Sequence, residues 1–166
     1  MSSDKARQLE RLLYRRSFRG LMAVYEHNYS MINRLVPQLR TATGSLYSSA
    51  PELPALYCRI EEQNRYTTTL RLTYFLDIPE QRRIADPDLL IRVYHDTRQC
   101  EVMSCRLNGF MPIGRYEDSS RPVIDCKWDS NLFLEKWLDY TLSKAYSFAN
   151  GQETEWPADL IDLEAV

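Results

Sequence analysis

The strongest structural signal in this chain is the stretch Arg92-Val93-Tyr94-His95-Asp96-Thr97-Arg98-Gln99-Cys100-Glu101-Val102. A strand pattern, a polar turn and a returning strand pattern follow one another, which is typical of a β-hairpin. The turn contains one of the two histidines, flanked by Asp96 and followed by Glu101. The stretch therefore predicts a hairpin with the best candidate for chemistry near its tip.

Outward from this hairpin, the sequence predicts a four-stranded antiparallel meander. Residues 89–96 and 100–107 form the hairpin around His95. Residues 56–62 and 66–76, rich in Tyr, Thr and Leu, form an earlier hairpin around Gln63-Asn64-Arg65. Asn64 suits a short loop because asparagine tolerates the left-handed conformation. Residues 79–87 read as a charged link between the two hairpins.

Helices are predicted on both sides of the meander. Residues 4–36 show apolar spacing of three to four, with a break at Gly20 and a stop at Pro37, which cannot continue a helix by hydrogen bonding. Residues 38–54, rich in Ser, Thr and Pro, read as a loop. The last helix runs from Trp128 or Asp129 to about Phe148, with Asp129 or Ser130 as its cap and Asn150-Gly151 as its end.

The fold class that follows is α+β, with the C-terminal helix packed on the apolar face of the sheet. We assign residues 1–150 to a single domain, since 166 residues are enough to bury one core. Residues 1–19 are a basic helical extension, and residues 151–166 are an acidic tail. The first 20 residues carry six basic against two acidic side chains, whereas the tail carries five acidic and no basic ones.

Composition excludes several classes of function. A net charge of −2 argues against general attraction to nucleic acid or to anionic membranes. No apolar run approaches the ~18 residues of a transmembrane helix, and the N-terminus lacks the features of a signal peptide, so we expect a cytoplasmic protein. The four cysteines form no CxxC pair, and we interpret them as reduced, packed thiols, with a redox or metal role as the alternative. No cofactor and no metal are predicted.

The register of the hairpins sets which side chains share a face. Pairing the apolar residues of the strands requires that opposed residue numbers sum to an even value. In the second hairpin this places Leu89, Ile91 and Val93 opposite Leu107, Cys105 and Met103, and His95 opposite Glu101. Both loops then have about three residues.

The same register gathers one arginine from each strand on the polar face of the sheet. Arginine binds carboxylate and phosphate with two parallel hydrogen bonds, so this face is the leading candidate for binding an acidic peptide or a phosphorylated small molecule. A solvated face, or one neutralised by Glu61 and Glu101, is the alternative. The acidic tail could occupy the face as an internal competitor. The predicted ligand contacts are Arg59, Arg71, Arg92, Tyr94 and Arg106.

A second hypothesis is a small hydrolase-like enzyme in which His95 is the general base and Asp96 or Glu101 orients it. The alternative is a histidine–carboxylate pair that only fixes the hairpin. Motifs such as GxSxG, the P-loop, GxGxxG and HExxH are absent. A third hypothesis, RNA binding, rests on 11 Tyr, 5 Phe and 3 Trp, but most of them occupy core spacing and the RNP pattern is missing.

Several short motifs occur in order along the chain: Leu35-Val36-Pro37, Arg65-Tyr66-Thr67-Thr68, Val93-Tyr94-His95-Asp96, Gly114-Arg115-Tyr116 and Phe133-Leu134-Glu135-Lys136-Trp137. Through these motifs the chain resembles the bacterial YqiB-like family, a domain of unknown function, from about Gly20 to Ala145. The resemblance implies no established activity, cofactor or catalytic residue. Our leading interpretation is therefore a non-catalytic cytoplasmic binding or adaptor module whose partner is a protein or an anionic small molecule.

Overall fold

The two hairpins are present in a larger sheet than the sequence predicts. The computed structural model describes residues 4–6, 17–80, 82–106, 123–149, 152–157 and 160. Within them the chain is α+β, with an antiparallel sheet of six strands in the order β5-β4-β3-β2-β1-β6. The strands are β1 (Ser45–Ser48), β2 (Leu56–Gln63), β3 (Thr67–Ile78), β4 (Arg82–Tyr94), β5 (Gln99–Arg106) and β6 (Gln152–Glu153).

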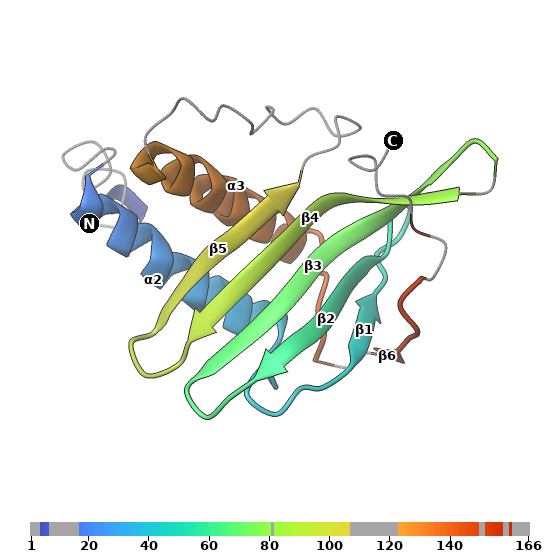
Figure 1. The fold of residues 1–166 in the computed structure, drawn as a ribbon, viewed down its shortest axis with the longest axis horizontal. Coiled ribbons are helices and arrows are strands. Elements are labelled where there is room, and N and C mark those ends of the chain that lie inside the picture. The colour runs from blue at the N-terminus through green and yellow to red at the C-terminus, as the bar shows by residue number, and fades with distance from the viewer. Residues whose placement is uncertain are drawn as a thin grey trace.

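Three predictions about strands are wrong. β1 lies in the predicted loop 38–54, β6 lies in the predicted tail, and β4 begins inside the predicted charged link. In β1, Leu46 and Ser48 are buried and alternate with half-buried neighbours, but four residues are too few to stand out among Ser and Thr. The start of β4 pairs with the end of β3, from Ile78↔Arg82 onward, and so forms an arm that extends the central hairpin (Figure 1).

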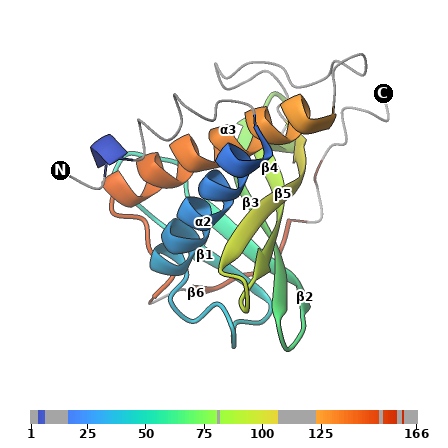
Figure 2. The same ribbon diagram turned by 90° about the vertical axis from the view of Figure 1, so that its left-hand side faces the viewer.

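Both long helices pack on one face of the sheet, and Figure 2 shows them side by side. They are α2 (Phe18–Leu35) and α3 (Val123–Ser143). Their apolar sides and the sheet enclose a core that includes Ile32, Leu72 and Leu138, each 0% exposed. A smaller cluster packs Leu21, Val24 and Tyr25 of α2 against Trp128 of α3. The helices leave the opposite face of the sheet, called the outer face below, uncovered.

The helix boundaries correct the sequence predictions. α2 begins after Ser17, whose hydroxyl oxygen accepts the Gly20 amide at 3.1 Å, so Gly20 lies in the first turn and does not break the helix. Its end before Pro37 is confirmed. α3 begins earlier than predicted, and Ser130 bonds back to helix carbonyls instead of capping. α3 ends at Ser143 and residues 144–149 are not helical, so the prediction that the helix continues to about Phe148 is wrong; the predicted terminating pair, Asn150-Gly151, lies outside the described residues.

The predicted register is confirmed in the first hairpin and wrong in the second. Cys58↔Leu72 and their neighbours pair as expected until a bulge between Ile60 and Glu62. In the second hairpin a bulge between Leu90 and Ile91 changes the phase of β5. Ile91 therefore pairs with Val102, and a four-residue turn, 95–98, replaces the predicted three-residue loop. The reason is burial, because Cys100 and Val102 enter the core while Met103 is 41% exposed.

Candidate functional site

The outer face carries the arginines that the sequence places together. Arg59 and Arg71 are cross-strand partners on β2 and β3. Arg92 on β4 is the partner of Thr69, which lies two residues before Arg71 and so on the same side of β3. Arg106 ends β5 opposite Asp88, but its side chain lies outside the described part. The described arginines therefore share one face, as alternation along the strands requires.

Two of these arginines belong to an ion-pair network. Arg71 Nη1 donates to both carboxylate oxygens of Asp88 at 3.0 Å, and Arg71 Nε lies 3.3 Å from Glu61 Oε1. Arg59 Nε donates to the same Glu61 oxygen at 2.7 Å. Burial lowers the pKa of Arg71, but Asp88 and Glu61 more than offset that effect, so the pKa is raised. Arg71 is therefore a fixed charge with its partners already in place.

Among the described residues, Arg92 is held by fewer ion-pair contacts than Arg71. Its cross-strand partner is Glu101, and its Nε lies 3.4 Å from the Thr69 hydroxyl. Glu101 accepts the Tyr94 hydroxyl at 2.6 Å and also lies 3.4 Å from Lys127 Nζ. Burial, followed by the hydrogen bond and the charge of Glu101, raises the pKa of Tyr94. The second half of the outer face thus joins the sheet to α3 through one carboxylate.

An aromatic row that the sequence analysis did not identify crosses the outer face beside Arg59. The rings of Tyr47 and Tyr57 are 6.1 Å apart, and those of Tyr57 and Phe75 are 4.7 Å apart. Trp156, from the C-terminal segment, packs edge-on against Phe75 at 4.9 Å, and the Arg59 guanidinium lies 4.4 Å from its ring centroid. The signal in the sequence was the single tryptophan of the acidic tail, but its place on the sheet depends on long-range packing.

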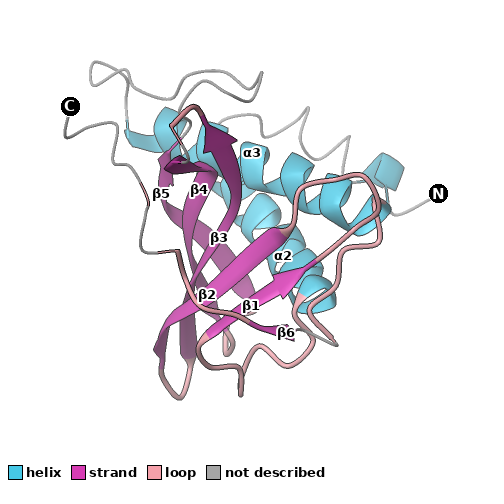
Figure 3. Ribbon diagram, turned by 90° about the vertical axis from the view of Figure 1, so that its right-hand side faces the viewer, coloured by secondary structure: helices cyan, strands magenta, loops and turns pink. Residues whose placement is uncertain are grey.

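The C-terminal segment reaches this row by extending the sheet. β6 pairs with β1, the Thr154 amide donates to the Ser45 carbonyl at 3.0 Å, and the Tyr47 hydroxyl bonds the Gln152 side chain. The segment then passes over β1 and β2, as Figure 3 shows, and Leu160 makes a bridge with Arg83. An acidic stretch of the chain therefore lies across the outer face.

His95 does not lie opposite Glu101, contrary to the predicted register. It is 6% exposed at the start of the turn, whereas Asp96 is exposed. Its Nε2 lies 2.8 Å from the Thr68 hydroxyl, which bonds onward to Gln63 Oε1. Burial, and then the charge of Arg40, lowers the pKa of His95, and Asp96 only partly offsets the shift. The sequence-predicted trio of His95, Asp96 and Glu101 is therefore not assembled into one site.

The hydrogen bonds around His95 define its tautomer. Gln63 Nε2 donates to the carbonyls of Leu39 and Ala42, so Gln63 Oε1 must accept the Thr68 proton. The Thr68 oxygen then accepts from His95 Nε2–H. His95 Nδ1 is left as a buried acceptor with no hydrogen-bond partner in the described structure. This arrangement anchors the turn to the start of β3 and to the segment after α2.

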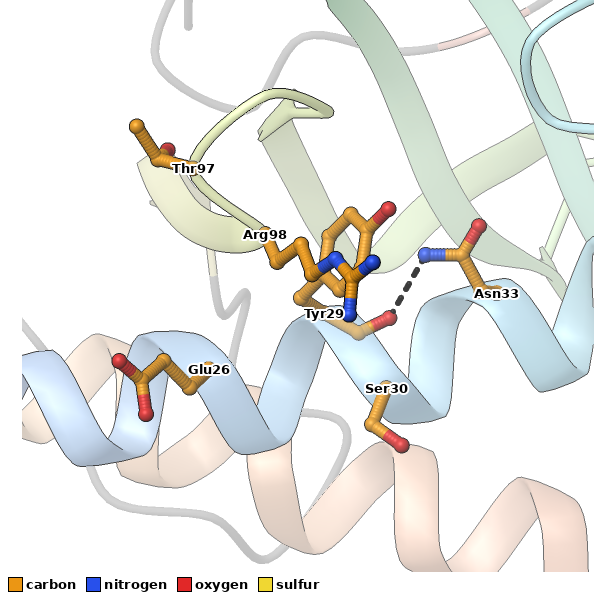
Figure 4. A pocket seen from close by; sticks show the side chains of 6 residues that line it. All are labelled: Glu26, Tyr29, Ser30, Asn33, Thr97 and Arg98. Carbon is orange, nitrogen blue, oxygen red and sulfur yellow. Dashed lines mark hydrogen bonds between the residues drawn. The ribbon is translucent and has the colours of Figure 1, made fainter.

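A hollow of about 640 Å³ lies between α2 and the 95–98 turn. Figure 4 shows Arg98 extending from the turn over α2, with Glu26 on the preceding part of the helix. His95, Asp96 and Glu101 are not among the residues that line this hollow. Tyr29 lines it, and the Tyr29 ring also packs edge-on against the His95 ring at 6.5 Å. The residues that line it are Glu26, Tyr29, Ser30, Asn33, Thr97 and Arg98.

The four cysteines are free thiols. Burial raises the pKa of Cys58 and of Cys105 to about 12, which favours the neutral thiol. The described ranges contain no group of three or more Cys, His, Asp or Glu side chains placed to hold a metal ion. They also contain no helix of the length and hydropathy needed to cross a membrane.

These features define an α+β protein with two helices on one side of an antiparallel sheet and an ion-paired, aromatic outer face on the other. The chain belongs to a family described as protein of unknown function (DUF1249), whose model matches residues 31–147. Neither a curated protein nor a solved structure matches the chain. The match includes all the sheet residues from β1 to β5 and ends before β6.

Proposed function

We propose that this protein is a bacterial, cytoplasmic, non-catalytic binding module of the YqiB-like kind, which recognises an acidic peptide on its outer sheet face. One observation carries the proposal: an acidic stretch of the chain already crosses this face, with Trp156 stacked on Arg59. A guanidinium held against an aromatic ring, beside hydroxyl groups and backbone donors, is a common way to bind a carboxylate-rich segment.

The charges of the face set the strength and the kind of binding. Arg59 and Arg71 are shared with Glu61 and Asp88, so the face is not a strong general attractor of anions. Recognition would instead combine three features: Arg92, the flat face of the Arg59 guanidinium, and the aromatic row. A phosphorylated small molecule remains the second ligand class, because phosphate uses the same two-pronged contact with arginine.

The buried ring of His95 has a structural role in this proposal. Its Nε2–H donates to the Thr68 hydroxyl on β3, and burial lowers its pKa, which favours the neutral ring. The histidine therefore supports the hairpin that carries Arg92 and Tyr94.

The test is fluorescence anisotropy of a labelled hexaglutamate peptide carrying one tryptophan, at two salt concentrations. We expect salt-sensitive binding, weakened about tenfold by Arg59→Ala and by Arg92→Ala, because each removes a charged donor. Arg65→Ala is the matched control, since Arg65 also stacks on an aromatic ring but lies on the β2–β3 loop. Equal affinity for the wild type and for both outer-face variants would contradict the proposal.

A further inference from the structure

Resting on the proposed acidic-peptide function, we infer that the natural ligand is an extended, tryptophan-containing acidic segment of a partner protein. It adds as a strand to β1 and displaces the chain's own residues 152–157 from the outer face. In this reading the segment 152–157, called the strap below, occupies the partner's place in the free protein. Its contacts therefore describe the chemistry of the ligand.

The first support is the edge of the sheet. β1 pairs with β2 on one side, and the described residues cover its other side with two residue pairs, Leu46↔Glu153 and Tyr47↔Gln152. One further backbone bond, from the Thr154 amide to the Ser45 carbonyl, continues this pairing. An edge strand offers a row of backbone donors and acceptors, which is the template for adding a peptide strand. The strap uses this template as an incoming peptide would.

The second support is the set of side-chain contacts beside that edge. After the strand pairing, the chain crosses the outer face, where Trp156 packs edge-on against both Phe75 and Tyr57 and the Arg59 guanidinium lies over its ring. Strand addition obtains affinity from the backbone and specificity from side-chain contacts of this kind. Because these contacts hold an indole with a guanidinium over it, we expect the partner to place a tryptophan here. In the strap, Pro157 follows the tryptophan and keeps the chain extended, and we expect a residue with the same effect in the partner.

The third support is that the strap is lightly held and carries negative charge. Gln152, Glu153 and Glu155 are exposed, and Trp156 is only partly buried. The strap also lies beyond residues 31–147, whereas β1, β2 and β3, which form the docking site, lie within them. The site therefore belongs to the family core, and the occupant is an addition to it.

The experiment uses the full-length protein and a labelled synthetic peptide with the sequence of residues 150–160. Binding to the wild type is compared with binding to Trp156→Ala, in which the aromatic row and Arg59 no longer contact the chain's own indole. A tethered strap competes at a high effective concentration, so we expect Trp156→Ala to bind the free peptide on the order of tenfold more tightly than the wild type does. Adding Arg59→Ala to Trp156→Ala should reverse this gain, and a peptide with alanine in place of tryptophan should not bind.

Tyr66→Ala is the matched control. Tyr66 is an exposed aromatic residue whose ring also contacts an arginine, Arg65, but it lies in the β2–β3 loop and not on the outer face. Equal peptide affinity for the wild type, Tyr66→Ala and Trp156→Ala would overturn the inference. If the peptide binds no variant while the hexaglutamate probe still binds, this inference fails and the proposed function stands; if neither probe binds, both fail. A wild-type dimer that Trp156→Ala dissociates, measured by light scattering, would make a second copy the occupant and overturn the partner assignment.

Discussion

The Nε2 atom of His95 lies 2.8 Å from the Thr68 hydroxyl, and this contact ties the 95–98 turn to the first residues of β3. The ring is buried and its other nitrogen has no hydrogen-bond partner among the described residues. A proton added to that nitrogen would place a charge in the interior without a partner, which links the stability of the fold to pH.

We expect stability to fall as the pH is lowered from 7.5 to 5.5. The pKa of His95 is below its usual value in the folded chain and returns to about 6.5 on unfolding, so the unfolded state binds more protons in this range. His95→Gln keeps an amide donor toward Thr68 but does not titrate, and it should flatten this dependence. His27→Gln should leave the His95 contribution in place. Urea midpoints at both pH values give the comparison, and an unchanged slope in His95→Gln would refute the assignment.

Arg71→Ala should destabilise the protein by about 2–4 kcal/mol, because it leaves the Asp88 carboxylate buried without its partner. Arg92→Ala removes a long contact to Thr69, an interaction with Tyr94 and the cross-strand neighbour of Glu101, and it should cost less than about 1 kcal/mol. Adding Asp88→Asn to Arg71→Ala should recover part of the loss. Denaturant titration measures all of these variants, and equal losses for the two arginine variants would count against the network.

Asn131→Ala should cost about 1–3 kcal/mol, because Asn131 Oδ1 accepts the Val102 amide of β5 at 2.9 Å and the residue is fully buried. Hydrogen exchange at Val102 should become faster. Ser130→Ala is the matched control in the same helix, since Ser130 bonds only to carbonyls of its own preceding turn, and we expect a loss below about 1 kcal/mol. Unchanged exchange at Val102 in Asn131→Ala would show that the contact does not protect this edge.

Alkylation should distinguish the four thiols. Cys58 is fully buried, and burial raises its pKa from 9.0 to about 12, which favours the unreactive neutral thiol. Cys100 is equally buried, and its pKa is raised as well, so both should resist iodoacetamide in the native protein. Cys126, which is only partly buried, should react first, as mass spectrometry of the labelled peptides would reveal. All four should react alike in urea; early labelling of Cys58 would contradict this packing.

The regular alternation of residues made part of this structure predictable. The apolar positions of β2 and β3 occur at period two, so their pairing and the common face of Arg59 and Arg71 follow from the sequence. The end of α2 before Pro37 follows from the chemistry of proline. Local patterns of this kind are encoded within a few residues.

The pairing of the second hairpin could not be predicted from such local patterns. A bulge beside Ile91 changes the phase of β5. Val102 is therefore buried and Met103 is exposed, which is the reverse of the predicted arrangement. As a result, Glu101 meets Arg92 and Tyr94 instead of His95, which stays on the core side as predicted and contacts Thr68. The burial that a bulge achieves depends on helices more than 20 residues away in the chain, which local alternation does not reveal.

The sequence by itself determined the α+β class, the positions of the two hairpins and the arginine-bearing face, because side chains on a strand alternate whatever surrounds them. Only the tertiary structure decided that Glu61 and Asp88 share those arginines, and that Trp156 lies against Arg59. These contacts join segments that are distant in sequence. The ion pairs need β2, β3 and β4 to be aligned. The contact of Trp156 with Arg59 also depends on the short strands β1 and β6, which gain stability only when the rest of the sheet is in place.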